Sequence, residues 1–291
     1  MTAPPGTPEP GESTEYTVGA VARLLGVPVA TLRSWNQRYG IGPRHHLPGR
    51  HRYYSVADLS VARRMTELIR AGATPASAAQ AALIVLEPAP APGEFGPLLA
   101  AAERMDVAAL VRLISGHLAH HGVCDTWNRL CRPTFEAIVD RQDAGGGYID
   151  VEHLLSWAVL TGLYRGVPAL VGPGREPRVL LACTAGERHT LPLEVLRAAL
   201  AERRCAALPL GADLPAEALS DALDRQTTAN VVVLWSQTAA TATAESVRVA
   251  ESHGVAVLRA GPGWTAAEYA GGGRYLGSLE KALAVILDVI R

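Results

Sequence analysis

The second half of the chain alternates short, uninterrupted apolar runs with amphipathic segments, and this restricts the fold more than any other feature of the sequence. The runs begin at residue 178 and are RVLLAC, AALPLG, NVVVLWS, VAVLRA and RYLG. Strands without in/out alternation are typical of a parallel sheet that is buried on both faces. Because the intervening segments have helical periodicity, we expect a doubly wound α/β domain of about five strands over 175–291.

Two proline-rich segments divide the preceding residues into further units. LEPAPAPGEFG, residues 86–96, has the composition of an extended linker, and GVPALVGPGREP, residues 166–177, is a second break. Four helical stretches with short connections lie between them and predict an antiparallel four-helix bundle over 97–170. Residues 1–14 are rich in Pro, Gly, Glu and Thr, so we expect a disordered tail ahead of an N-terminal domain over 15–85.

Charge is distributed unevenly along the chain. Residues 15–70 hold nine arginines against three acidic residues, whereas the rest holds 18 basic and 25 acidic residues, and the net charge is −1. A basic unit joined to an acidic body is typical of a phosphate-binding module. An ordinary solvated arginine face has the same composition, so the motifs must decide between the two.

Several classes of protein are disfavoured by what the sequence lacks. No apolar run approaches the ~18 residues of a membrane span, and the N-terminus has neither the basic nor the apolar region of a secretory signal. The four cysteines form no CxxC pair and suit neither a zinc site nor a disulfide framework. We therefore expect a soluble, cytoplasmic protein with buried cysteines.

Residues 17–40, TVGAVARLLGVPVATLRSWNQRYG, have the pattern of a helix, a tight turn and a second helix. Thr17 is placed to cap the first helix, and Gly26 supplies the turn. Thr31, Arg33 and Arg38 lie on or near the second helix, within reach of a major groove.

A segment bounded by proline and glycine follows, IGPRHHLPGRHRYYSVADL, and we expect it to form a hairpin. Basic side chains at a hairpin tip reach phosphates or a minor groove, and tyrosines beside them contact the DNA backbone. The basic residues of this segment are Arg44, Arg50, His51 and Arg52, and Tyr53 and Tyr54 follow them.

Together these residues resemble the winged helix-turn-helix of MerR-family transcriptional regulators. The matching positions are Thr17–Val18, Ala22–Arg23–Leu24–Leu25–Gly26–Val27, Thr31–Leu32–Arg33, Trp35, Arg38–Tyr39–Gly40, Arg52–Tyr53–Tyr54 and Asp58–Leu59. The resemblance implies that DNA is bound by Thr31, Arg33, Arg38, Tyr39, Arg44, Arg50, His51, Arg52 and Tyr53. We expect Leu32 and Trp35 in the core. Asn36 stands where the family commonly has an acidic residue, so a local salt bridge would be missing.

The expected partners follow from this module. One winged module buries too little surface to specify a long site, so we expect a homo-oligomer, a dimer or tetramer, on a pseudo-palindromic duplex operator. RNA polymerase is a further expected partner.

The loop after the first strand of the α/β domain carries Glu187 and His189, two residues apart and just before a helix. Ligands of such folds bind at the carboxyl ends of the strands. A histidine held there by a neighbouring carboxylate can be an axial metal ligand. Taken alone, the pair also fits an ordinary solvated loop histidine.

This region resembles cobalamin-binding domains, whose loop has an acidic residue, then x, His, x, x, Gly. Here the loop reads Glu187-Arg-His189-Thr-Leu-Pro192, and LPLGADLP, residues 208–215, also matches. The resemblance implies that His189 is an axial ligand of cobalt. It also implies that the buried nucleotide tail lies beside Ser236, Gly261 and Gly263.

The preceding helical region resembles the bundle that caps cobalamin in the light-sensing MerR regulators. A Glu-His pair faces the upper side of the corrin there and matches Glu152–His153, which makes His153 a candidate upper ligand of cobalt. In those regulators the adenosyl form holds the protein on DNA in the dark, and light breaks the cobalt–carbon bond. Two residues depart from the pattern: Pro192 replaces a glycine, and Gln142 replaces a tryptophan that packs over the adenosyl group.

Our interpretation is a DNA-binding transcriptional regulator, not an enzyme, whose C-terminal domain senses a cobalamin. The alternative is a MerR-type regulator with a degenerate cobalamin-binding fold that binds another small molecule or only a protein partner. A cobalamin enzyme would need a substrate-binding domain for which the chain has no room. A serine hydrolase built on Ser236 would need a GxSxG elbow, and the sequence has none.

Overall fold

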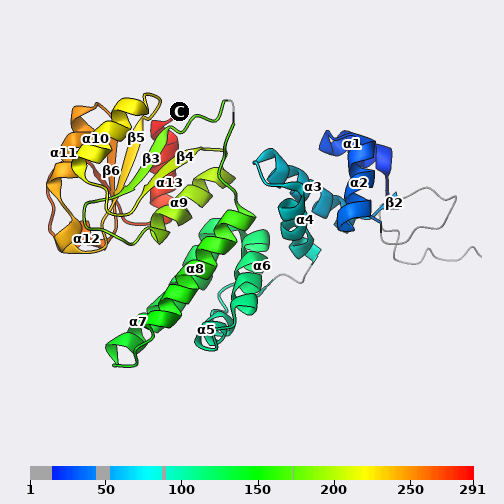
Figure 1. Ribbon diagram of the computed structural model, residues 1–291, viewed down its shortest axis with the longest axis horizontal. Coiled ribbons are helices and arrows are strands. Elements are labelled where there is room, and N and C mark those ends of the chain that lie inside the picture. Colours follow the sequence, from blue (N-terminus) through cyan, green and yellow to red (C-terminus); the bar gives the residue numbers. More distant parts are fainter. Residues whose placement is uncertain (1–14, 44–52, 87–89, 173) are drawn as a thin grey trace, which may run out of the picture. The chain divides into compact units, whose positions relative to one another are not determined.

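The computed structural model describes residues 15–43, 53–86, 90–172 and 174–291 (Figure 1). These residues form two compact units, one up to residue 69 with 74–87, and the other comprising 70–73 and 88–291. The expected tail, 1–14, and the basic residues Arg44, Arg50, His51 and Arg52 lie outside the described residues.

Two helices joined by a tight turn form the centre of the first unit. Helix α1, Val18–Leu25, begins after Thr17, whose side-chain oxygen accepts the Ala20 N–H at 3.2 Å. It ends at Gly26, which has φ 63°, a conformation that glycine adopts without strain. Helix α2, Val29–Tyr39, buries Leu32 and Trp35. The expected cap, turn and core residues of this motif are therefore confirmed.

The remaining elements of this unit are two short strands and two further helices. Strand β1, Tyr16–Thr17, pairs antiparallel with strand β2, Tyr53–Tyr54, so the end of the expected hairpin is joined to the residues just before α1. Tyr54 is buried and Tyr53 is exposed. Two further helices, α3 at Val56–Arg70 and α4 at Pro75–Leu83, are followed by a 3₁₀ turn at Ile84–Leu86.

The second unit begins with the expected helices. They are α5, Gly96–Glu103; α6, Val107–Asp125; α7, Arg132–Asp143; and α8, Ile149–Gly166. Leu110, Ile114 and Leu155 are fully buried between them. Gly162 allows α6 and α8 to approach closely, because a Cβ there would lie 2.7 Å from Ile114 Cγ2.

Helix α6 contains a break that the sequence did not predict. Gly122 has φ 75° and ψ −180°, and a π-helical turn, Thr126–Cys131, follows. The Val123 N–H, which the break frees from the helix, donates to both carboxylate oxygens of Glu202 at 3.1 and 3.2 Å. Because Glu202 ends helix α9, Leu191–Glu202, the break is satisfied by the α/β part of the chain.

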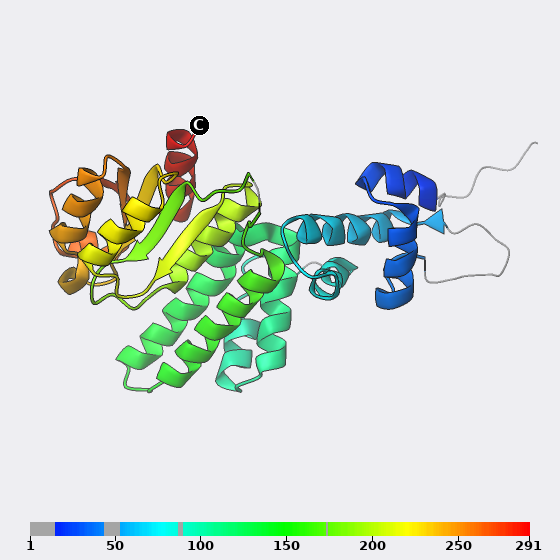
Figure 2. The same cartoon turned by 45° about the horizontal axis from the view of Figure 1, so that its top comes forward.

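Five parallel strands form the sheet, in the order β4-β3-β5-β6-β7 (Figures 1 and 2). They are β3, Val179–Cys183; β4, Ala207–Gly211; β5, Val231–Trp235; β6, Ala256–Ala260; and β7, Arg274–Leu276. The other helices are α10, Ala216–Arg225; α11, Ala244–Ser252; α12, Pro262–Ala266; and α13, Leu279–Val289. The expected five-stranded parallel α/β fold is confirmed.

The sheet is buried on both faces, as its uninterrupted apolar runs require. Alternate residues of β3 belong to different cores: Leu181 packs with α9, α13 and the bundle, and Leu180 packs with α10 and α11. The strand order reverses between β3 and its neighbour β5. A crevice outside the carboxyl ends of these two strands is where such folds bind ligands.

Candidate functional site

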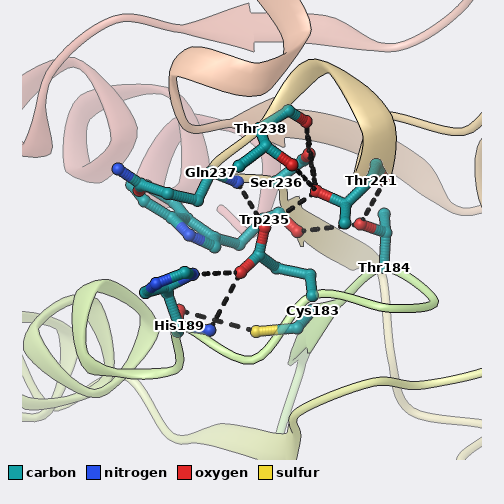
Figure 3. Close-up of polar contacts among 9 residues, drawn as sticks. Cys183, Thr184, His189, Trp235, Ser236, Gln237, Thr238 and Thr241 are labelled. Atoms are coloured by element: carbon teal, nitrogen blue, oxygen red, sulfur yellow. Dashed lines mark hydrogen bonds and ion pairs between the residues drawn. The ribbon is translucent and has the colours of Figure 1, made fainter.

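A buried carboxylate organises the loop that follows β3. Glu187 is only 1% exposed. It accepts hydrogen bonds from the main-chain N–H of His189 at 2.9 Å and from His189 Nδ1 at 2.5 Å. On its other side it accepts the Gln237 N–H at 2.6 Å and the Thr241 hydroxyl at 2.8 Å (Figure 3). The loop after β3 is thus tied to the loop after β5 through one side chain.

These contacts set the charge of Glu187 and the tautomer of His189. Burial by itself raises the pKa of the carboxyl, but the hydrogen bonds from His189, Gln237 and Thr241 lower that pKa to about 2. The carboxylate is therefore ionised at neutral pH and places the proton of a neutral imidazole on Nδ1. In that tautomer Nε2 carries the lone pair, on a side chain that is 58% exposed, and an exposed lone pair is what a metal ligand requires.

Two neighbouring loops brace this arrangement. Asp213, just after β4, accepts the Gly186 N–H at 2.6 Å and donates its own N–H to the Glu187 carbonyl at 2.7 Å. The Thr184 hydroxyl donates to the Thr241 carbonyl at 2.6 Å. Segment 208–215, which resembles cobalamin-binding domains, therefore stabilises the loop that carries His189.

A cavity of about 320 Å³ opens beside this loop, at the carboxyl ends of β5, β6 and β7. Pro192 and Leu196 of α9 line one side, Trp235 and Gly261 line another, and Trp127 of the bundle closes part of it. The Trp235 Nε1 is buried and has no hydrogen-bond partner among the described residues. Buried donors are normally paired, so this one stands out in the cavity wall.

Of the residues expected beside a nucleotide tail, Gly261 lines this cavity, whereas Ser236 and Gly263 are not among its lining residues. Ser236 is fully buried, and its hydroxyl contacts the Thr238 carbonyl at 2.9 Å and Thr241 Oγ1 at 2.7 Å. It braces the loop, and Trp235 is the residue of this strand end that lines the cavity. A Cβ at Gly261 would lie 2.2 Å from the Ser236 carbonyl oxygen, and one at Gly263 would lie 2.3 Å from that of Thr238. Both glycines therefore permit close packing of main chains.

Two of the expected bundle residues meet each other. Gln142 Nε2 on α7 donates to Glu152 Oε2 on α8 at 2.7 Å, and His153 is exposed next to it. The structure thus joins Gln142 to Glu152 and Glu187 to His189. Among the described side chains, no direct hydrogen bond links one pair to the other.

The candidate DNA-binding side chains occupy the outer side of α2. Arg33 and Arg38 are exposed, and Thr31 and Tyr39 are partly exposed. Gln37 is also exposed, one turn after Arg33, and the sequence analysis missed it although the spacing of four residues was visible. Asn36, at the family's acidic position, donates from Nδ2 to the Pro43 carbonyl at 3.4 Å. An amide thus holds the turn after α2.

Within the described ranges, no group of three or more His, Cys, Asp or Glu side chains is arranged to hold a metal ion. None of the described helices combines the length and the apolar character that crossing a membrane requires.

Comparison with known proteins agrees with this architecture. Residues 16–82 match the family model of the MerR HTH family regulatory proteins. The HTH-type transcriptional repressor CarA of Myxococcus xanthus is 30% identical over 212 residues, which cover 70% of this chain and 71% of CarA. The repressor CarH of the same organism is 26% identical over 228 residues, covering 72% of this chain and 74% of CarH.

Among solved structures, the monomethylamine corrinoid protein of Methanosarcina barkeri superimposes with a TM-score of 0.52 at 14% identity. The match covers 66% of this chain and 96% of that protein, so the bundle and the sheet share its fold. With its MerR-type helix-turn-helix and its identity to CarA over two thirds of both chains, the chain belongs to the family of the HTH-type transcriptional repressors CarA and CarH and is a MerR-type transcriptional regulator.

Proposed function

We propose that this regulator senses a cobalamin, which it binds at the carboxyl edge of its sheet with His189 as the lower axial ligand of cobalt. The observation that carries the proposal is the Glu187–His189 pair. A buried, ionised carboxylate holds Nδ1 and leaves Nε2 exposed. Carboxylates that orient a ligating histidine in this way are the usual outer-shell partners of metal sites.

The donor set fits a metal that arrives within a macrocycle. A corrin supplies the equatorial ligands of cobalt, so the protein needs to contribute one axial nitrogen and no cluster. His189 offers that nitrogen at the end of a braced loop. A free metal ion would require the three or four side chains that the described residues do not bring together.

The cavity beside β5 fits the nucleotide tail. Its volume of about 320 Å³ is at the lower end of the ~300–1,000 Å³ of ligand pockets, so it would take a base and its sugar and leave the corrin outside. Trp235 lines it, and the buried Nε1 of this residue has no hydrogen-bond partner among the described residues. Pro192 is at the second position of α9, where a main-chain N–H has no acceptor within the helix. The N–H that proline lacks therefore costs the helix no hydrogen bond. Its ring narrows the cavity without disturbing the helix.

The upper side of the corrin would face the bundle residues Gln142, Glu152 and His153. When bound, cobalamin supplies a cobalt whose upper ligand can be exchanged. The hydrogen-bonded Gln142–Glu152 pair is smaller and more polar than an aromatic cover. We therefore expect hydroxo- or methylcobalamin to bind at least as well as adenosylcobalamin, and His153 to serve as the upper ligand when no alkyl group is present.

Cobalamin binding at this site would regulate the binding of the protein to DNA. The proposed activity of the protein is regulatory, not enzymatic. The exposed face of α2, with Arg33 and Arg38, supports insertion into a major groove, and Tyr53 supports contact with the backbone. A homodimer or tetramer on a pseudo-palindromic operator would supply enough contacts for specificity. Footprinting of a single unsymmetrical half-site at monomer stoichiometry would contradict this assembly.

The test is a set of spectral titrations with the hydroxo, methyl and adenosyl forms on the wild type, His189→Ala and His153→Ala. His253→Ala, directly after α11 of the same unit, is the matched control. We expect saturable binding by the wild type and the control, and a spectrum of the bound form that changes in His189→Ala. Tight binding with an unchanged spectrum in His189→Ala would refute the axial role. Operator binding with each form, in the dark and after illumination, then measures the response.

The alternative is a degenerate domain that binds another molecule or only a protein. If the wild type binds none of the three forms of cobalamin, the result supports that alternative. Pro192→Gly is then the first variant to examine. Recovered cobalamin binding in Pro192→Gly would show that the narrowed cavity prevents binding in the wild type.

A further inference from the structure

A second cavity lies at the opposite edge of the sheet and is lined by arginines. Its volume is about 550 Å³. Arg178 directly precedes β3, Arg203 and Arg204 follow α9, and Arg291 follows α13, so the cavity is at the amino-terminal ends of the strands. Arg175 completes a set of five guanidinium groups around one space. No residue of the Glu187–His189 loop reaches it.

The positive charge of this cavity is not balanced by its acidic neighbours. Glu176 is its one lining acidic side chain among the described residues, and it also accepts the Gly174 N–H at 3.3 Å. Glu202 lies 4.0 Å from Arg203, but its carboxylate already accepts the Val123 N–H. Among the described lining residues, the arginine side chains therefore outnumber the carboxylates.

Neutral groups hold two of the arginines in place. Arg178 donates to Asn230 Oδ1 at 2.7 Å and to the Ile290 carbonyl. Arg203 donates to the Ala199 carbonyl at 2.8 Å. These acceptors orient the guanidinium groups without neutralising them. Within the described part of the chain, the guanidinium groups of Arg204 and Arg291 make no hydrogen bond or ion pair, so their N–H donors are available.

We propose that this cavity is a binding site for a small phosphorylated anion, separate from the proposed cobalamin site. Guanidinium groups bind phosphate oxygens through paired N–H donors, and a ring of them around a hollow offers such pairs from several sides. The surrounding charge favours a small ligand. Residues 88–291 hold 18 basic and 22 acidic residues, so a long polyanion would meet net negative charge outside the cavity, whereas a small one would stay within its positive field.

The experiment is calorimetric titration of the full-length protein with pyrophosphate, inorganic phosphate and ADP in a chloride buffer. The first two arms test the free anion, and ADP tests whether a nucleoside phosphate is preferred. Arg204→Gln and Arg291→Gln each remove one available guanidinium from the lining. We expect each to weaken binding of the preferred anion about tenfold, the usual effect of one charge-assisted hydrogen bond.

The matched control is Arg248→Gln, an exposed arginine on α11 that does not line the cavity. It should bind as the wild type does, and so should His189→Ala, which separates this proposal from the cobalamin site. Absence of saturable binding, or equal affinity in all four variants, would overturn the proposal. Competition by a short non-operator duplex that depends on Arg204 would also overturn it, because the ligand would then be nucleic acid.

Discussion

Glu187 accepts two hydrogen bonds from the same residue, His189, one from its main-chain N–H at 2.9 Å and one from Nδ1 at 2.5 Å. Two donors from the loop after β5, the Gln237 N–H and the Thr241 hydroxyl, occupy its other oxygen. An exposed histidine is thus given a fixed direction relative to the sheet. This geometry separates His189 from an ordinary solvated loop histidine, because such a histidine would have no buried carboxylate dedicated to it.

The depressed pKa of Glu187 predicts a specific dependence of stability on pH. The pKa of Glu187 in the folded state is about 2, below the ordinary 4.5. The ionised side chain therefore contributes fully to the free energy of unfolding above pH 4.5, and this contribution is lost as pH falls toward 2. Glu187→Gln should lower the free energy of unfolding by about 2 kcal/mol at pH 7. Urea unfolding of both proteins at several pH values should show this difference shrinking below pH 4.5. A constant difference would contradict the ionised, hydrogen-bonded state.

The fold could be predicted from the sequence where a local pattern carries the physical cause. Each strand is an uninterrupted apolar run, because both of its faces are buried, and Thr17 and Gly26 mark the ends of α1 by their own chemistry. The Glu187–His189 pair was found for the same reason, since two residues of one loop act together. The spacing alone could not show that Gln237 and Thr241 complete the arrangement.

Features that depend on distant residues could not be predicted in this way. The break at Gly122 is stabilised by Glu202, eighty residues later. Ser236 was expected beside the ligand, yet only the packing of the β5 loop shows that its hydroxyl is used internally and that Trp235 lines the cavity. The arginines of the second cavity come from three separate segments, so they form no motif in the sequence.

Trp235→Phe tests the unused N–H in the wall of the first cavity. The change keeps an aromatic wall but removes a buried donor that has no partner among the described residues. If that donor contacts the nucleotide tail, affinity for cobalamin should fall about tenfold, while the stability of the unliganded protein stays the same or rises, because an unpaired buried group costs ~1–3 kcal/mol. Trp127→Phe, in the same cavity wall, is the control. Equal effects of the two changes on affinity would show that the N–H has no special role.

His117 should make the bundle sensitive to mildly acidic pH. Its side chain is buried, and burial, followed by the nearby His121, lowers its pKa to about 4, although Asp125 at 3.8 Å opposes the shift and Arg129 and His120 add to it. The folded state therefore keeps the ring neutral, and stability is lost as pH falls from about 6.5 to 4. The loss attributable to this residue is at most about 3 kcal/mol.

The variant His117→Asn keeps a polar group near Thr126, which now contacts His117 Nδ1 at 2.9 Å, but it does not titrate. Its unfolding free energy, followed by circular dichroism, should vary less between pH 6.5 and 4 than that of the wild type. Parallel pH profiles for the two proteins would mean that His117 is protonated as easily in the folded chain as in the unfolded one.

Arg33→Ala should weaken binding to the operator duplex and flatten its salt dependence. The exposed guanidinium at the outer side of α2 is expected to contact a phosphate or a base edge. Loss of one phosphate contact reduces the slope of log affinity against log salt by about one. Arg225→Ala is the control, since Arg225 pairs with Asp221 on α10 of the other unit. An unchanged affinity and slope in Arg33→Ala would remove this residue from the DNA interface.

Gly162→Ala tests the close approach of α6 and α8. In an open helical position this change would stabilise the protein by up to ~1 kcal/mol, but here the new Cβ would lie 2.7 Å from Ile114 Cγ2. We expect a net destabilisation of about 1–3 kcal/mol from overpacking. Gly166→Ala, on the same helix, adds a Cβ at an ordinary 3.7 Å from Leu118 and should be neutral or stabilising. Ile114→Ala removes the methyl group that clashes, so in that background Gly162→Ala should no longer destabilise. If the two glycine variants unfold alike in the wild-type background, the bundle can open at Gly162, and this contact does not fix the spacing of the two helices.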